Sequence, residues 1–115
     1  MYIGQLCWSN QSLVQYVKTR VIDYLRSQPN ATIISISQND NNLYCKSTAE
    51  QAIYTADGAL IGPLLRAVNA IADVVATTFP GRDIKVDTLA YLWTRQVRSL
   101  FLVPPPISCI LYVNV

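Results

Sequence analysis

Hydrophobic residues recur along the chain with two spacings, one typical of strands and one typical of helices. Residues 31–38 place Ile on both faces of an extended chain, as in a strand that is buried on both sides within a parallel sheet. Residues 83–91 alternate between apolar and polar side chains and predict another strand, which is expected to end at residues 91–93. Residues 2–8 and 108–113 predict two further short strands.

Apolar residues at three- and four-residue intervals predict two long helices. The first begins after an N-cap at Ser9 or Asn10 and ends before Pro29, because the residue before a proline resists the helical conformation. The second begins at residues 62–63, where a proline suits the first turn, and ends at residues 80–81 (Pro-Gly). Between them, the pattern indicates a long loop from residue 46 to residue 60, with a helical turn near residues 47–53.

The alternation of these elements predicts an α/β fold. Strands that alternate with helices form parallel sheets through right-handed crossovers. We therefore predict one domain, residues 1–115, that is a parallel four-stranded β/α half-barrel of partial TIM-barrel type. Since a closed barrel of this class needs eight strands, the half-barrel is expected to be completed by self-association, most simply as a homodimer.

Composition and charge exclude several classes of function. The chain has 51% hydrophobic and 14% charged residues, which suits a packed core. The net charge is only +2 and the basic residues are scattered, so we expect no nucleic-acid partner. The amino terminus has no signal-peptide pattern, and three prolines interrupt the apolar segment 100–115, so no membrane-spanning segment is expected. The compartment stays open.

The residue types that carry common catalytic chemistry are scarce. There is no histidine, which excludes Ser-His and Cys-His nucleophilic pairs and histidine metal ligands. Cys7, Cys45 and Cys109 are far apart and odd in number, so they predict buried free thiols rather than a disulfide framework. Cys45 has no general base nearby in the sequence and is not expected to act as a nucleophile.

The strongest indication of function is a run of short polar residues that follows the strand predicted at residues 31–38. Parallel α/β folds place their ligands at the carboxyl ends of strands. Asparagine amides both donate and accept hydrogen bonds and suit sugar hydroxyls, whereas aromatic rings suit stacking. Asx-turns that cap the strand end are the alternative interpretation of the run. The candidate ligand contacts at the strand ends are Asn39, Asn42, Tyr91, Trp93 and Asn10.

Three segments carry a resemblance to a known family. They are SISQNDNNLYC at residues 35–45, LLRAVNAIA at residues 64–72, and DTLAY with the following TR at residues 87–95. They are similar to the signature segments of the domain of unknown function numbered 4838, in the same order from about Cys7 to Arg95. That family resembles the (β/α)₈ catalytic domains of α-glucuronidases and other glycoside hydrolases.

The resemblance implies carbohydrate binding or hydrolysis. Glycoside hydrolysis commonly uses two carboxyl groups, and Asp40 is the candidate catalytic acid because it alone follows the central strand directly. A second carboxylate is harder to find, since Asp87 lies within a predicted strand and is expected to be a core or edge residue with a local partner. The alternatives are a non-catalytic self-assembling module derived from a barrel, or a fragment of a larger enzyme.

One departure from the family pattern concerns its cysteines. The family usually continues as Cys-x-Cys-x-x-Cys, whereas this chain has Cys45, Ser47 and Glu50 at those positions. We therefore do not carry a metal site over to this chain, and we expect no metal and no other cofactor.

Overall fold

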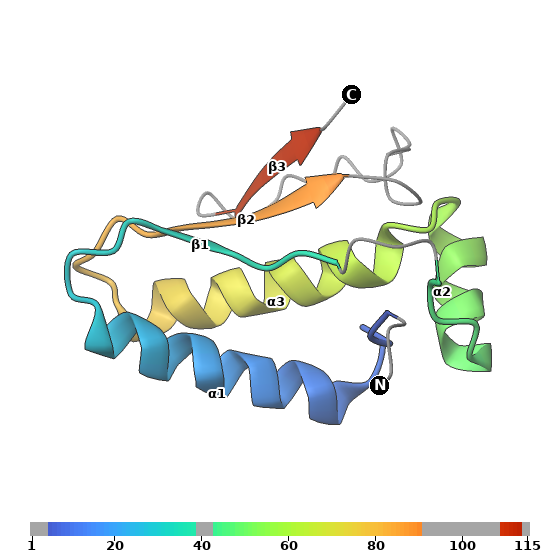
Figure 1. Cartoon of the computed structure of the whole chain (residues 1–115), viewed down its shortest axis with the longest axis horizontal. Coiled ribbons are helices and arrows are strands. Elements are labelled where there is room, and N and C mark those ends of the chain that lie inside the picture. Colours follow the sequence, from blue (N-terminus) through green and yellow to red (C-terminus); the bar gives the residue numbers. More distant parts are fainter. Residues whose placement is uncertain (1–4, 39–42, 91–108, 114–115) are drawn as a thin grey trace.

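The structure is a computed structural model that describes residues 5–38, 43–90 and 109–113. These residues form three helices and one parallel sheet of three strands in the order β1-β2-β3. In Figure 1, α1 and α3 lie on one side of the sheet, and α2 lies beyond the carboxyl ends of the strands. The elements in chain order are α1 (Gln11–Ser27), β1 (Ile33–Ser35), α2 (Thr48–Asp57), α3 (Gly62–Thr78), β2 (Lys85–Ala90) and β3 (Cys109–Val113).

The predicted four-stranded half-barrel is wrong. The described part of the chain contains three strands, because residues 5–8 form no strand where the sequence pattern had indicated one. The Gln5 N–H instead donates a hydrogen bond of 3.2 Å to the Leu43 carbonyl, outside the sheet. The chain is therefore a small open α/β unit rather than half of a barrel. The geometric reason for expecting self-association falls with the half-barrel, and self-association itself stays an untested prediction.

The two long helices begin and end where their sequence signals predict. The Asn10 side chain caps α1 by accepting hydrogen bonds from the backbone N–H groups of Ser12 and Leu13. α1 ends at Ser27, before the predicted stop at Pro29. α3 carries a proline in its first turn and ends just before residues 80–81.

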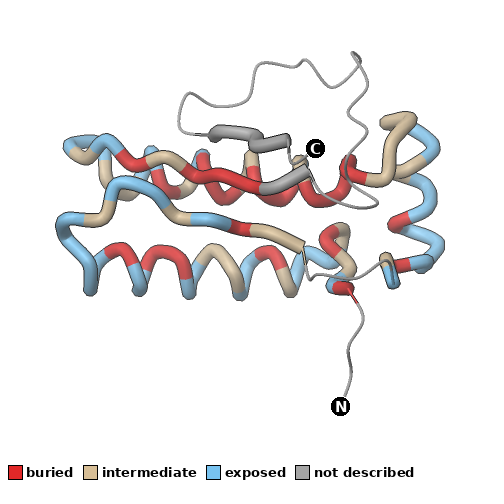
Figure 2. The backbone as a smooth tube through the Cα atoms, turned by 45° about the horizontal axis from the view of Figure 1, so that its top comes forward, coloured by how far each residue is buried: buried red, intermediate tan, exposed pale blue. Residues whose placement is uncertain are grey.

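The core lies between α1, α3 and one face of the sheet. Figure 2 shows the buried positions running along α3 and along β2. On β2, Val86 and Thr88 are fully buried on the side that faces α3, and Ile36 supplies the corresponding core residue after β1. Ile33 on the opposite side of β1 is 51% exposed. The expectation of a strand buried on both faces is therefore wrong, since the described helices cover one face only.

The predicted loop of residues 46–60 contains a helix, α2, which is longer than the single turn predicted near residues 47–53. We call residues 43–47, which lead into this helix, the strap. The Ser47 side chain caps α2 by accepting from the Glu50 N–H. Gly58 ends the helix with φ 71°, a left-handed conformation that glycine adopts without steric cost. Thus α2 is a complete, doubly capped helix that brings its side chains beside the carboxyl end of the sheet.

Candidate functional site

The face of the sheet that points away from α1 and α3, here called the helix-distal face, carries polar side chains. Successive strand residues point to opposite faces, so Asp87 lies opposite the buried pair Val86 and Thr88. Asp87 is aligned with Ser35 on the neighbouring strand. Two residues further along the chain, the Ser37 hydroxyl lies 3.1 Å from that of Ser35. The helix-distal face thus carries one carboxylate and two hydroxyls on neighbouring strands.

Asp87 is a buried residue of β2, as predicted for a core position, and one of its carboxylate oxygens has no partner in the described part of the chain. The residue is 8% exposed, and its Oδ1 atom has no hydrogen-bond partner within the described part of the chain. Its backbone carbonyl accepts from the Ile36 N–H at 2.9 Å, which fixes the position of the residue in the sheet. Leaving a buried polar group unpaired costs about 1–3 kcal/mol, and more for a charged group. The Oδ1 atom is shielded from solvent, so a ligand can bind it only after the residues that cover it move aside.

Most of the predicted site residues lie outside the described residues. They are Asp40, Asn39, Asn42, Tyr91 and Trp93, and their roles stay predictions. Asn10 is described, and its amide oxygen is occupied by the cap of α1. The structure thus assigns Asn10 a clear structural role, and its role in ligand binding is untested.

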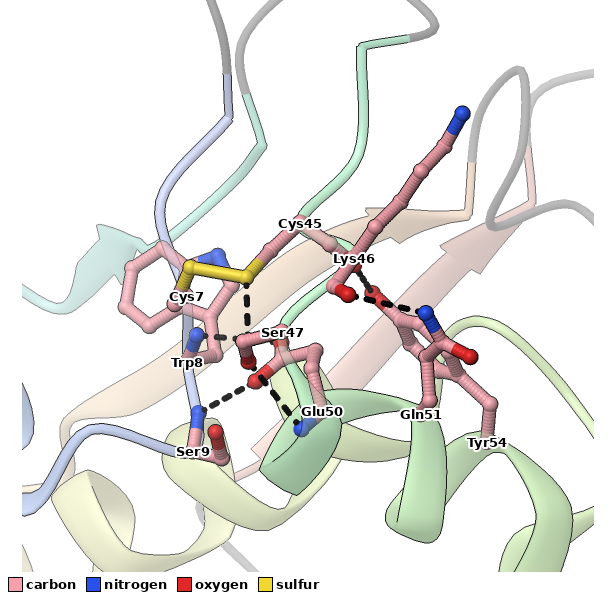
Figure 3. Close-up of a disulfide and its surroundings, with 9 residues drawn as sticks. All are labelled: Cys7, Trp8, Ser9, Cys45, Lys46, Ser47, Glu50, Gln51 and Tyr54. Carbon is pink, nitrogen blue, oxygen red and sulfur yellow. Dashed lines mark hydrogen bonds between the residues drawn. A yellow bond between two sulfur atoms is a disulfide. The ribbon is translucent and has the colours of Figure 1, made fainter.

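The cysteine expectation is wrong for two of the three residues. Cys7 and Cys45 form a disulfide that joins the segment before α1 to the strap leading into α2 (Figure 3). The two residues are separated by 38 positions, so their pairing depends on the fold and has no local signal in the sequence. A disulfide is typical of proteins in oxidising compartments.

Glu50 stands at the last position of the Cys-x-Cys-x-x-Cys pattern described above. It is almost fully buried, at 1% exposure. Its two carboxylate oxygens accept hydrogen bonds from the backbone N–H groups of Trp8, at 3.1 Å, and Ser9, at 2.9 Å (Figure 3). The disulfide and this carboxylate therefore hold the same segment. We call the group Cys7, Cys45 and Glu50 the carboxyl-end clamp.

Beside the clamp lies a groove of about 240 Å³, here called the α2 groove. Two tyrosine rings in it pack edge to face, with centroids 6.0 Å apart. The Lys46 ammonium lies 5.3 Å from the centroid of the Tyr44 ring. Its lining residues are Tyr44, Lys46, Gln51, Tyr54, Thr55 and Leu60.

The Tyr54 hydroxyl holds the strap in place. It donates a hydrogen bond of 2.7 Å to the Cys45 carbonyl. Burial raises the pKa of Tyr54, and the charge of Glu50 and the nearby Tyr44 act in the same direction. The hydroxyl therefore remains a donor throughout the neutral and mildly alkaline range. The Gln51 amide makes a matching bond of 2.8 Å to the Lys46 carbonyl.

Sequence reasoning missed the clamp and the groove. One signal for α2 was present, because Ser47 followed three residues later by Glu50 is the pattern of a helix capping box. Only half of that box forms, since the Glu50 carboxylate binds the segment before α1 rather than the Ser47 N–H. Trp8 packs in the core.

Two further findings concern metals and membranes. Within the described ranges, no group of three or more His, Cys, Asp or Glu side chains is arranged to hold a metal ion. None of the described helices is long and apolar enough by itself to span a membrane. α2 and α3 meet the length and composition requirement only as a pair, with a 90° bend between them.

The parallel sheet, with the described helices packed on one of its faces, defines an α/β protein. The chain belongs to the family described as domain of unknown function (DUF4838), whose model matches residues 2–102. The match confirms the family that the three sequence segments indicated. No curated protein and no solved structure matches the chain.

Proposed function

We propose that this protein binds a saccharide on the helix-distal face, towards the carboxyl ends of β1 and β2. The observation that carries the proposal is the buried Asp87 carboxylate, whose Oδ1 atom has no partner in the described structure. The family resemblance to glycoside hydrolases supports the same class of ligand. The carboxyl ends of parallel strands are also where α/β folds most often bind ligands.

The chemistry of this face suits sugar hydroxyl groups. An ionised carboxylate accepts hydrogen bonds only, so Asp87 matches the O–H donors of a sugar. The hydroxyls of Ser35 and Ser37 both donate and accept, which suits neighbouring positions on the sugar ring. A hydrogen bond to a charged group contributes about 1.5–3 kcal/mol, so one bond to Asp87 would dominate the affinity.

Binding is proposed ahead of hydrolysis because hydrolysis needs a pair of carboxyl groups. Asp87 supplies one carboxylate on the helix-distal face. Substitution of Asp40, the candidate acid, tests whether this residue supplies the second carboxyl group. If the protein is a hydrolase, Asp40→Asn should abolish turnover of chromogenic glycosides while the fold and the saccharide affinity are retained.

The binding proposal is tested by titrating the protein with glucose, xylose, mannose and their β-linked tetrasaccharides. Calorimetry gives the affinity, and thermal unfolding gives the stabilisation by bound ligand. Asp87→Asn should weaken binding at least about tenfold, the equivalent of roughly 1.4 kcal/mol. Asp73→Asn is the matched control, since Asp73 is an exposed aspartate on α3, across the sheet from this face. Binding that is unchanged in Asp87→Asn, or the absence of binding to every sugar, would contradict the proposal.

A further inference from the structure

We infer that the α2 groove is a second saccharide subsite, in which one sugar ring packs against Tyr44 beside the perpendicular ring of Tyr54. This inference rests on the proposed function and makes it more specific, because two subsites favour an oligosaccharide over a single sugar. Residues 43–46 continue from β1, and α2 lies beyond the carboxyl ends of the strands (Figure 1). The groove is therefore at the same end of the sheet as the proposed site.

The groove combines an aromatic wall with a polar rim, which is the combination that a sugar ring needs. A pyranose presents C–H groups on its flat faces and hydroxyls around its edge. The C–H groups pack against an aromatic face, which carries partial negative charge. The half-buried Tyr44 ring supplies that wall, with the Tyr54 ring perpendicular to it. The exposed side chains of Lys46, Gln51 and Thr55 supply the rim.

The wall is held in place before any ligand binds. The Tyr54 ring is fixed by the bond from its hydroxyl to the Cys45 carbonyl, and Cys45 is itself tied to Cys7. The Tyr44 ring is fixed against Tyr54 by their edge-to-face contact. Figure 3 shows Tyr54 and Gln51 on α2 reaching up to the strap at residues 45–46. A rigid aromatic surface loses little conformational freedom on binding, which favours affinity.

Lys46 is the polar group best placed to bind the ligand. Its side chain extends away from the disulfide in Figure 3, and in the described part of the chain its ammonium forms no ion pair. It lies near the Tyr44 ring and can donate up to three hydrogen bonds. A groove of about 240 Å³ is smaller than the roughly 300–1,000 Å³ of most small-molecule pockets, so a single sugar ring is the expected occupant. Each further sugar unit must therefore bind elsewhere at this end of the sheet.

The experiment compares monosaccharides with tetrasaccharides in three variants of the full chain. Tyr44→Ala should weaken binding of the preferred tetrasaccharide about tenfold or more and leave binding of the corresponding monosaccharide unchanged. Tyr44→Phe should bind nearly as tightly as the parent protein, since it keeps the ring. Tyr24→Ala, which removes an exposed tyrosine from α1, is the matched control and should have no effect.

The outcomes separate this inference from the proposed function. If Asp87→Asn weakens binding and Tyr44→Ala does not, the second subsite is wrong and the proposed function stands. If no sugar binds the parent protein, both are wrong. Should Tyr44→Ala fail to fold, amide chemical shifts of the parent protein decide. Tetrasaccharide-specific shifts at Gln51 and Thr55 support the subsite, and their absence overturns it.

Discussion

Each end of the sheet is held by one charged side chain that binds the backbone of a distant segment. At the carboxyl end, Glu50 accepts hydrogen bonds from the N–H groups of Trp8 and Ser9. At the amino end, the Arg82 guanidinium donates hydrogen bonds to three backbone carbonyls at and after the end of α1, and it stacks on a phenylalanine ring 5.0 Å away. The three carbonyls belong to Leu25, Gln28 and Ala31.

The charge at each end follows the polarity of the backbone groups that it binds. N–H groups lack partners before and at the start of a helix, so a carboxylate satisfies them, and carbonyls lack partners at its end, so a cation does. The two charged side chains differ in burial. Glu50 is fully buried and is reinforced by a disulfide, whereas Arg82 is partly exposed and has no covalent support. The end that carries the proposed ligand sites is therefore the more firmly held.

Removal of the disulfide should have the largest effect on stability. A cross-link that closes a loop of about 38 residues stabilises the folded state by about 4 kcal/mol on the chain-entropy model. Cys7→Ala with Cys45→Ala should lower the free energy of unfolding by roughly that amount, as measured by urea denaturation. The parent protein under reducing conditions is the control and should lose a similar amount. A loss below about 1 kcal/mol would show that the disulfide adds little to the clamp.

Truncation of Glu50 should cause the second-largest loss of stability. Glu50→Ala leaves two backbone N–H groups without acceptors in buried or partly buried surroundings, which should cost about 3 kcal/mol. Glu50→Gln keeps one acceptor oxygen and should lose clearly less, so the difference between the two variants isolates the second hydrogen bond. Equal losses in both variants would mean that packing, rather than hydrogen bonding, sets the effect.

The losses of stability from removing the disulfide and from truncating Glu50 should also be non-additive. The disulfide and Glu50 fix the same segment, so once one is removed the other has less structure left to hold. The variant that combines Glu50→Ala with loss of both cysteines should therefore be more stable than the sum of the separate losses predicts. Simple additivity would mean that the two contacts act independently.

Truncation of Arg82 at the amino end should be milder. Arg82→Ala removes three hydrogen bonds and the contact with Phe79, but water can reach the freed carbonyls in part, so the expected loss is about 1.5 kcal/mol. Arg82→Lys keeps the charge without the planar fork and should lose an intermediate amount. A loss equal to that of Glu50→Ala would remove the difference between the two ends.

The difference between helices with a long apolar stripe and a helix without one explains how much of the fold the sequence predicts. α1 and α3 carry long apolar stripes with clear start and stop signals, and both were predicted nearly to the residue. α2 was predicted only as a single helical turn, because it is short and its one buried residue is Glu50 rather than an apolar side chain. Without an apolar stripe, periodicity has nothing to detect.

The contacts that form the site are harder to predict than the elements. The pairing of Cys7 with Cys45, and of Glu50 with the segment before α1, joins residues about 40 positions apart. Such contacts depend on the fold as a whole. Alternation along β2 placed Asp87 on the face opposite Val86, but it could not show that the carboxylate is buried or that its Oδ1 atom has no partner in the described part of the chain.

Substitution of Asp87 should change the free energy of unfolding in the opposite direction from substitution of Glu50 or Arg82. Because its carboxylate is buried and its Oδ1 atom has no described partner, the Asp87 side chain should cost the folded protein stability. Asp87→Asn removes the charge at constant shape and should raise the free energy of unfolding by about 1 kcal/mol, while saccharide affinity falls. Asp73→Asn, an exposed control, should change neither quantity. If Asp87→Asn instead lowers stability, the carboxylate has a structural partner, and its assignment as a ligand-binding group is wrong.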